Sequence, residues 1–539
     1  MDSNFKRTKM KNKYILLSAL AIGFASCEPE FDNAVDANYS SGEANFSTYV
    51  AVGNSLTAGY MDGTVSRGSQ ENSYPHLLSQ QFALVGGGEF TQPSYADDVN
   101  NLGGLMLGGN PIGNTRLVID ASQGRPENIA GTSTIEVSNL QAKAYNNMGV
   151  PGAKSFHLLA PGYGNLAGVA LGQANPYFVR HATTPTATVL GDAMSKSPTF
   201  FTNWIGSNDV LAYATNGGAA SNGTSAAADH NSTGNTDVTT YGSNDITNSG
   251  VFANVYSTII NTLTTNGAKG VVCTIPSVTS IPYFTTVPYA PIPDATINAN
   301  PQVGLLTQLY QFLAVATNGR VSPLNLTDGM PNPILINDVE LTDLSAQISA
   351  FATGSGNPLL VSNAATLGAL YGRARQTTSA DLVVLPASSV IGTTSANPSP
   401  FNIQGLTQPM ANKWVLTASE KAKVAAATTA YNNAIISIAN AKNTAAGKTI
   451  IAVADMNAVM NQLVSGIRSE NGSLYTANYF SGSATEGAVL FSLDGVHPNA
   501  RGYAVIANEI IKVINRDFKA NLPLKNASYY PGINIVPSN

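Results

Sequence analysis

Short runs of β-branched and apolar residues recur along the chain. They occupy residues 47–53, 142–149, 199–206, 270–276 and 449–454, and four of the five end at a Gly or Pro. Short apolar runs bounded by turn residues are typical of strands that are buried on both faces. The sequence therefore predicts five strands of a parallel sheet.

Apolar residues at helical spacing fill segments that lie between or after these runs: 73–82, 251–265, 418–441 and 499–518. The alternation of strands and helices predicts an α/β fold, a three-layer α/β/α sandwich with the helices on the two faces of the sheet. Segment 418–441 is rich in Ala and Lys, and Gly447 stands where a C-terminal cap is expected before the next strand.

Four long insertions separate these elements, at about residues 84–138, 158–195, 212–247 and 280–412. The third has low complexity and predicts a flexible loop. The fourth contains residues 300–317 with apolar positions at helical spacing, and long insertions of this kind tend to be functional or disordered. A subdomain and a lid are both open interpretations of that insertion.

The N-terminus has the features of a secretory signal peptide over residues 1–26. Five basic residues precede an apolar run at 14–25 that is too short to span a membrane. Residues 24–27, FASC, resemble the bacterial lipobox, which implies lipidation of Cys27 and a membrane anchor there; an ordinary cleaved signal with an incidental Cys is the alternative. The acidic residues that follow, within a polar tether at 27–45, resemble the export tag of Bacteroidetes surface lipoproteins. We therefore expect a cell-envelope lipoprotein anchored in the outer membrane, and both the surface-exposed and the inner face of that membrane stay open.

Charge and cysteine content exclude several classes of function. Without residues 1–26 the chain has 22 basic and 31 acidic residues, a net charge near −9. That balance argues against binding to nucleic acid or to an anionic membrane through electrostatics. Apart from Cys27 there is only Cys273, in an apolar run, and no group of residues has metal-ligand spacing. We expect Cys273 to be a buried strand residue, with no disulfide, metal or other cofactor.

Two sequence blocks at the ends of predicted strands contain residue types that nucleophilic catalysis requires. Residues 53–59, GNSLTAG, follow the first strand, so that Ser55 stands on a turn where its hydroxyl and its backbone N–H both face a substrate. Residues 494–498, DGVHP, precede the last helix, which Pro498 is expected to begin. Asp494 can there orient His497, and His497 can act as the base for Ser55.

Two further blocks supply donors for a developing oxyanion. Residues 147–152, NMGVPG, follow the second strand, and residues 206–209, GSND, follow the third. The backbone N–H of Gly149 and the side-chain amide of Asn208 are donor types that stabilise such a charge. Asp209 is expected to cap the segment that follows it.

Together, these four blocks resemble the GDSL, or SGNH, hydrolase superfamily. The resemblance maps the family's signature residues onto Ser55, Gly149, Asn208 and His497. It implies a flavodoxin-like α/β/α fold over residues 46–520, with a C-terminal tail at 521–539. It also implies that Ser55 is the nucleophile, that His497 is the base oriented by Asp494, and that Ser55, Gly149 and Asn208 form the oxyanion hole. The chain departs from the family pattern at Asn54, where the family has Asp, so that a charge beside the nucleophile is lost.

The expected function is hydrolysis of acyl esters through an acyl-enzyme, with lipid esters as the favoured substrates. Two alternatives stay open: an esterase that removes O-acetyl groups from carbohydrates, and a non-catalytic accessory or binding lipoprotein beside an outer-membrane transporter. Asp494 has an alternative role as a cap of the last helix. The aromatic residues Tyr283, Phe284 and Tyr289 are expected either to line an acyl pocket or to pack in the core. The remaining histidines are expected at the surface or in packing: His76, His157, His181 and His230.

Overall fold

The computed structural model describes residues 38–327, 329–468, 472–481 and 489–539. The chain divides into two units, 1–39 and 40–539, and the fold belongs to the second. The predicted signal peptide, Cys27 and most of the predicted tether lie outside the described residues. None of the helices in the described part of the chain combines the length and apolar character that crossing a membrane requires.

The centre of the fold is a five-stranded, all-parallel sheet in the order β13-β8-β7-β1-β6. The strands are β1 Tyr49–Gly53, β6 Asn147–Gly149, β7 Phe200–Trp204, β8 Lys269–Cys273 and β13 Ile451–Ala454. Each falls within or overlaps one of the five predicted runs, so the prediction of a parallel sheet in an α/β protein is confirmed. The strands are almost entirely buried, as strands covered on both faces must be.

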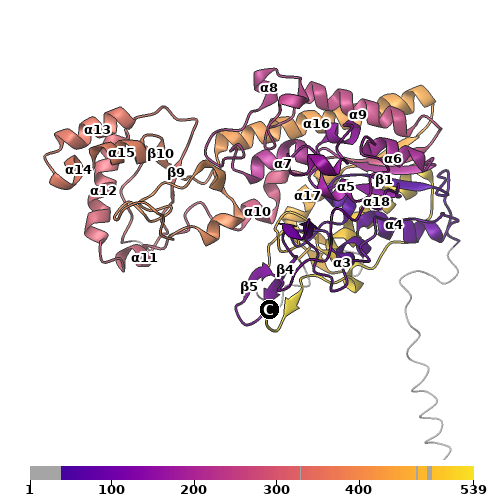
Figure 1. The fold of residues 1–539 in the computed structure, drawn as a ribbon, viewed down its shortest axis with the longest axis horizontal. Coiled ribbons are helices and arrows are strands. Elements are labelled where there is room, and N and C mark those ends of the chain that lie inside the picture. Colours follow the sequence, from indigo (N-terminus) through magenta and orange to yellow (C-terminus); the bar gives the residue numbers. More distant parts are fainter. Residues whose placement is uncertain (1–37, 328, 469–471, 482–488) are drawn as a thin grey trace, which may run out of the picture. The chain divides into compact units, whose positions relative to one another are not determined.

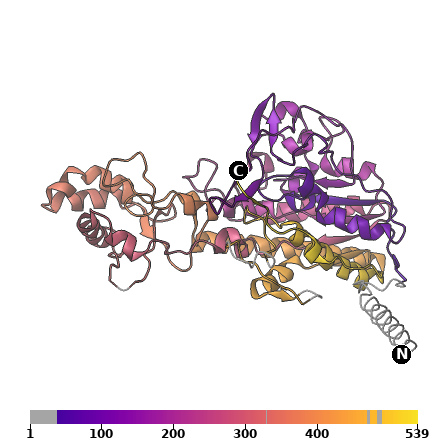
Figure 2. The same ribbon diagram turned by 90° about the horizontal axis from the view of Figure 1, so that it is seen from below.

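The four predicted helices are present and pack beside the sheet: α4 Tyr74–Ala83, α9 Ser249–Leu263, α16 Ala418–Ala446 and α18 Ala500–Phe518. Helices α16 and α9 lie side by side (Figure 1). Helix α18 packs against α4 (Figures 1 and 2). Both α16 and α18 contact β13 and β8. Helix α16 begins with a reciprocal cap between Thr417 and Glu420 and ends at Gly447 in the left-handed conformation, as the sequence predicts.

The last helix begins at Ala500, two residues after Pro498, the expected first helical residue, and one after the start of the predicted segment. Asn499 is its N-terminal cap, because the Asn499 side chain accepts a hydrogen bond from the Gly502 N–H at 2.9 Å. Pro498 therefore lies just outside α18. Asp494 lies farther back and does not cap this helix, so that its carboxylate is available to the loop.

The insertions contain further elements. Small sheets join β2 Leu105–Leu107 with β3 Asn110–Gly113, β9 Leu335–Asn337 with β10 Ala374–Gln376, β11 Leu382–Val383 with β12 Val415–Leu416, and β14 Ile467–Arg468 with β15 Leu474–Tyr475. A three-stranded sheet contains β4 Leu117–Asp120, β5 Arg125–Asn128 and β16 Ile535–Val536, so the predicted tail pairs with the first insertion. The helices are α2 Ser55–Ala58, α3 Arg67–Glu71, α5 Pro176–Val179, α6 Val189–Ser195, α7 Asn208–Thr215, α8 His230–Thr233, α10 Pro282–Thr285, α11 Asp294–Asn298, α12 Val303–Ala316, α13 Ser345–Gly354, α14 Pro358–Ser362, α15 Ala364–Tyr371 and α17 Met456–Ser465.

Segment 212–247, predicted to be a flexible loop, is tied down by polar contacts. His230 Nε2 lies 2.9 Å from Asp245 Oδ2, and the His230 ring stacks on Tyr241 with centroids 3.7 Å apart. The Tyr431 hydroxyl of α16 donates to the carbonyl of Thr247, the last residue of this segment. A sequence of small polar residues does not reveal such contacts, because each partner is distant from the other along the chain.

Candidate active site

Ser55 lies at the carboxyl end of β1, as the first residue of the four-residue helix α2. Asn54 caps this helix through its Oδ1, which accepts from the Leu56 N–H at 3.0 Å. A Cβ at Gly53 would lie 2.1 Å from Thr57 Oγ1 and 2.5 Å from the Trp204 carbonyl oxygen, so only glycine fits before the turn. The local sequence thus forces a tight strand-to-helix turn that presents Ser55 at the edge of the sheet.

Asp494, His497 and Ser55 form a continuous hydrogen-bonded chain. His497 Nε2 lies 2.8 Å from Ser55 Oγ, and His497 Nδ1 lies 3.0 Å from Asp494 Oδ2. Asp494 Oδ1 also accepts from the backbone N–H groups of Val496 and His497, both at 2.8 Å. The carboxylate therefore holds its own loop and the imidazole in one arrangement, in which the far nitrogen meets the serine hydroxyl.

The surroundings keep Asp494 ionised. Burial by itself would raise the pKa of Asp494, but the charge of His497 and the hydrogen bonds from His497 and Val496 outweigh it and hold this pKa below its usual value. The Gly63 N–H donates to Asp494 Oδ2 at 3.2 Å. The Tyr60 ring lies against the imidazole of His497, with centroids 4.5 Å apart. An ionised acceptor on Nδ1 favours the tautomer in which Nε2 is free to accept a proton from Ser55.

Gly149 lies at the end of β6, directly against α2. A Cβ at this position would be 2.3 Å from the Ala58 nitrogen and 2.6 Å from the Thr57 carbonyl carbon, so only glycine allows this approach. The Gly149 N–H already donates to Asn147 Oδ1 at 3.0 Å. To act on a substrate, this donor has to be shared with, or released from, the Asn147 side chain.

Asn208 lies at the start of α7, after β7. Its Nδ2 donates to the Ala153 carbonyl oxygen at 3.0 Å. A primary amide has two N–H donors, so this bond leaves the second one for a substrate oxygen. The N–H of Ser55 is a third donor of this kind, because backbone donors in the first turn of a helix have no partner within the helix.

Asp209 has a different role from the predicted cap. Its two carboxylate oxygens accept from the backbone N–H and the hydroxyl of Ser155, each at 2.8 Å. Burial raises the pKa of Asp209 above its usual value, against the effect of these bonds. The contact ties the loop after β6 to the loop after β7, and so fixes Asn208 relative to Ala153.

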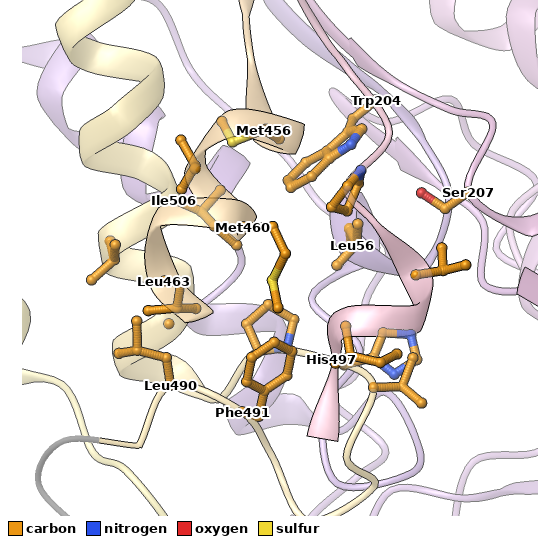
Figure 3. Close-up of a pocket in the computed structure, with 18 of the residues that line it drawn as sticks. Leu56, Trp204, Ser207, Met456, Met460, Leu463, Leu490, Phe491, His497 and Ile506 are labelled. Carbon is orange, nitrogen blue, oxygen red and sulfur yellow. The ribbon is translucent and has the colours of Figure 1, made fainter. Parts of the chain in front are cut away.

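An apolar cavity of about 880 Å³, which includes the part open to solvent, begins at Ser55 and His497. Figure 3 shows the Met460 side chain in the middle of the lining residues. The cavity is lined by Asn54, Ser55, Leu56, Trp204, Ser207, Leu211, Pro276, Val278, Ile281, Met456, Val459, Met460, Leu463, Ile467, Leu490, Phe491, Val496, His497, Pro498, Gly502, Val505 and Ile506. A mostly apolar lining with a few polar groups is typical of sites for small organic ligands.

Sequence reasoning missed α17, which provides much of this lining. Its buried positions Met456, Met460 and Leu463 follow helical spacing on one face. This spacing was visible in the sequence, but the segment is only ten residues long and contains three Asn or Gln residues. The aromatic residues predicted as possible pocket lining pack elsewhere: Phe284 is buried, Tyr289 is exposed, and Tyr283 donates its hydroxyl to the Thr215 carbonyl.

Sequence reasoning also missed Asp62, a buried acid beside the catalytic loop. Asp62 Oδ1 accepts from the Leu493 N–H at 2.9 Å, and the Asp62 N–H donates to Ser492 Oγ at 3.0 Å. Burial, with a smaller contribution from the charge of Asp494, raises the pKa of Asp62 to about 7. Its sequence context, MDGT, indicates a turn and does not indicate a buried acid.

The remaining cysteine and histidine candidates make contacts typical of structural residues. Cys273 is fully buried in β8, as predicted, and burial raises the pKa of its thiol. His157 Nδ1 accepts from the Lys154 N–H, and His76 pairs with Gln80. Within the described ranges, no group of three or more His, Cys, Asp or Glu side chains is arranged to hold a metal ion.

No protein-family model matches this chain, and no curated protein or solved structure is significantly similar to it.

Proposed function

We propose that the protein is a serine ester hydrolase that works through an acyl-enzyme on Ser55. The observation that carries the proposal is the hydrogen-bonded chain from Asp494 through His497 to Ser55, with contacts of 3.0 and 2.8 Å. An oriented imidazole within hydrogen-bond reach of a serine hydroxyl is the arrangement that nucleophilic catalysis needs. The donors at Gly149 and Asn208 and the apolar cavity beside Ser55 support the same proposal.

The reaction follows from these positions. His497 Nε2 takes the proton of Ser55 as Oγ attacks the ester carbonyl carbon, and the N–H groups of Ser55, Gly149 and Asn208 stabilise the oxyanion. His497 then gives its proton to the leaving alcohol. Water takes the place of the alcohol, loses a proton to His497 and attacks the acyl-enzyme, which releases the acid and the free serine.

We also propose that the chain belongs to the GDSL, or SGNH, superfamily and has its flavodoxin-like three-layer sandwich. The order of the strands supports this: numbered along the chain they run 2-1-3-4-5, as in flavodoxin-like sheets. In such sheets the ligand binds at the carboxyl ends of the strands, where the strand order reverses. Ser55 follows β1 and Asn208 follows β7, the two strands on either side of that point.

Lipid esters are the substrates that the cavity favours. Acetyl groups on a carbohydrate do not need a cavity lined largely by Leu, Ile, Val and Met, whereas an acyl chain gains free energy from each methylene that it buries. An anchor at Cys27 in the outer membrane, as the sequence suggests, would hold the enzyme near lipids. A role in O-deacetylation of glycans is the second candidate, and the two differ in the length of acyl group that they require.

The test is labelling with a fluorophosphonate probe together with hydrolysis of p-nitrophenyl esters. Ser55→Ala is expected to abolish labelling and to lower kcat by a factor on the order of a million, as loss of a nucleophile does. Ser232→Ala, at an exposed serine of α8, is the matched control and should label like the wild type. Undiminished labelling of Ser55→Ala would refute the proposal. A wild-type protein that neither labels nor hydrolyses esters would favour a non-catalytic binding lipoprotein instead.

A further inference from the structure

The apolar cavity extends from Ser55 to one side only. It runs past the carboxyl ends of β7, β8 and β13, where Trp204, Pro276 and Met456 line it. Strand β6 lies on the other side of β1, and Gly149 is not among the lining residues. If the carbonyl oxygen of an ester at Ser55 points toward Gly149, it points away from the cavity. The cavity is then available to one of the other two substituents of the carbonyl carbon, the acyl chain or the alcohol.

The lining changes character with distance from Ser55. Near the nucleophile, Asn54 Nδ2 and Ser207 Oγ are buried and have no hydrogen-bond partner among the described residues. Buried donors without partners are costly, and a bound polar group or a water molecule at this end would satisfy them. Beyond them the lining is largely aliphatic or aromatic, and it comes from α17, α18, the segment before α18, α7 and the segment after β8. A polar head followed by an apolar tail matches this profile.

The position of His497 indicates which half of an ester is the tail. His497 must protonate the leaving oxygen, and water must later occupy the same place to hydrolyse the acyl-enzyme. The side chain of His497 lines the cavity and keeps 14% of its surface exposed. Water would not readily approach through a cavity lined by Met, Leu, Ile and Phe. The leaving alcohol therefore belongs on the solvent side, and the acyl group belongs in the cavity.

Met460 occupies the part of the cavity that a chain must cross. It projects from the buried face of α17, is 6% exposed, and lies in the middle of the lining residues (Figure 3). Methionine is unbranched and adaptable, so a substitution here changes the free space without removing a polar contact.

From these observations we propose that the cavity is an acyl-chain subsite for medium- and long-chain esters, and that Met460 limits the length of chain it accepts. The proposal rests on the function proposed above and deepens it, because it assigns the cavity to the acid half of the ester and names the residue that selects it.

Two series of esters test the assignment. In the first the acyl group grows from acetyl through octanoyl to hexadecanoyl on a constant p-nitrophenol; in the second a constant acetyl group is joined to alcohols of increasing length. We expect kcat/KM to rise about fourfold per methylene in the acyl series until the cavity is full, and to change little in the alcohol series. A rise confined to the alcohol series, or no rise in either, overturns the proposal.

Variants of Met460 test the role of this residue. Met460→Ala should move the preferred acyl length to longer chains. Met460→Phe should lower hydrolysis of dodecanoyl esters by roughly tenfold or more, and leave acetyl esters nearly unaffected. Met460→Leu, which conserves volume, is the control, and thermal unfolding of each variant shows whether it is folded. A chain-length profile that is unchanged in both Met460→Ala and a folded Met460→Phe overturns the role of Met460.

Binding of the acid product separates this proposal from the proposed function. Dodecanoate binding is measured by the displacement of a fluorescent fatty acid. We expect this binding to persist in Ser55→Ala and to weaken in Met460→Phe. If the wild type hydrolyses no ester but this pattern holds, the proposed function fails and the acyl subsite stands. If esters are hydrolysed but dodecanoate does not bind, or binds equally to both variants, the subsite fails and the hydrolase stands.

Discussion

Two carboxyl groups with opposite behaviour lie on either side of the turn that leads to His497. Asp494 accepts from His497 and Val496, which lowers its pKa despite burial, whereas burial raises the pKa of Asp62 to about 7. Asp62 has a single backbone donor, the Leu493 N–H, and the nearby charge of Asp494 opposes its ionisation. The same protein environment thus keeps one acid charged and favours the neutral form of the other.

The raised pKa of Asp62 predicts a dependence of stability on pH. The folded protein holds this proton up to about pH 7, whereas the unfolded chain loses it near pH 4, so ionisation of Asp62 costs stability as the pH rises between these values. A pKa difference of one is worth about 1.4 kcal/mol, so the difference between about 4 and about 7 gives a total on the order of 4 kcal/mol. Asp62→Asn keeps an acceptor for the Leu493 N–H and cannot ionise. The free energy of unfolding of Asp62→Asn is measured with denaturant from pH 4 to pH 8 and compared with that of the wild type. The difference in favour of the variant should increase as the pH rises to 7 and stay constant above it. Parallel curves over the whole range would show that Asp62 ionises freely in the fold.

At this scale the sequence predicts residue types but not their hydrogen-bond partners. Ser55, Asp494 and His497 could be chosen because they occupy strand-end blocks, and the structure brings the three together. The bond from the Gly149 N–H to Asn147 Oδ1 could not be predicted, because Asn147 belongs to the strand and its side-chain direction depends on α2. The sequence also does not show that Asn54 Nδ2 has no hydrogen-bond partner among the described residues. An Asn that caps a helix uses only its side-chain oxygen, so the cap does not determine what its nitrogen contacts.

Helix α2 is too short to be stable by itself, so the site depends on the elements that enclose it. Asn147 Nδ2 donates to the Thr57 carbonyl oxygen of α2 at 3.0 Å and to Gln92 Oε1 at 2.9 Å. Gly149 brings the end of β6 against the backbone of Thr57 and Ala58. The position of Ser55 therefore follows from the packing of β6 on α2.

A methyl group at position 149 should displace the nucleophile. In Gly149→Ala the new Cβ would meet backbone atoms of α2 at 2.3–2.6 Å, so the helix itself has to move. Overpacking of this kind costs about 1–3 kcal/mol, and a shift of about 1 Å at Ser55 would lower kcat/KM by roughly a hundredfold. Ester kinetics and thermal unfolding measure the two effects. Gly304→Ala, at a helical glycine with open space around it, is the control and should keep full activity. Normal kinetics in a folded Gly149→Ala would contradict the dependence of Ser55 on β6.

Element prediction succeeded where a periodic pattern was strong. The five strands are runs of apolar residues that are buried on both faces, and α9, α16 and α18 have long regular patterns. Helix α17 has only three buried positions, too few to stand out, although its Met460 lies inside the cavity. The short sheets within the insertions depend on pairing between distant segments, as in β16 with β4, and no local pattern specifies such a pair.

At the scale of the whole molecule, the insertion predicted at 280–412 contacts the Asp494–His497 loop through Tyr283 and Leu385. The Tyr283 N–H donates to the Gly495 carbonyl oxygen at 2.9 Å, and Leu385 Cδ2 lies 2.9 Å from the place a Cβ of Gly495 would take. Gly495 has φ +72° and stands between Asp494 and His497, so these contacts support the turn that holds both. Among the described residues, none that lines the cavity lies between 282 and 455. Apart from Ile281 at its start, the described part of the insertion thus does not line this cavity, and it supports the site from beside the turn.

Two leucines of this insertion should therefore affect the proposed ester hydrolysis differently. Leu313 is fully buried on α12, and Leu313→Ala should cost about 2–5 kcal/mol of stability while kcat/KM stays unchanged below the unfolding temperature. Leu385 is half-buried beside Gly495, and Leu385→Ala should lower kcat/KM by roughly tenfold to a hundredfold, because the Asp494–His497 turn loses a packing partner. Rates of ester hydrolysis and of fluorophosphonate labelling, compared with thermal unfolding of the same samples, separate the two effects. Loss of activity in a folded Leu313→Ala would mean that the distant part of the insertion acts on the site after all, as a lid would.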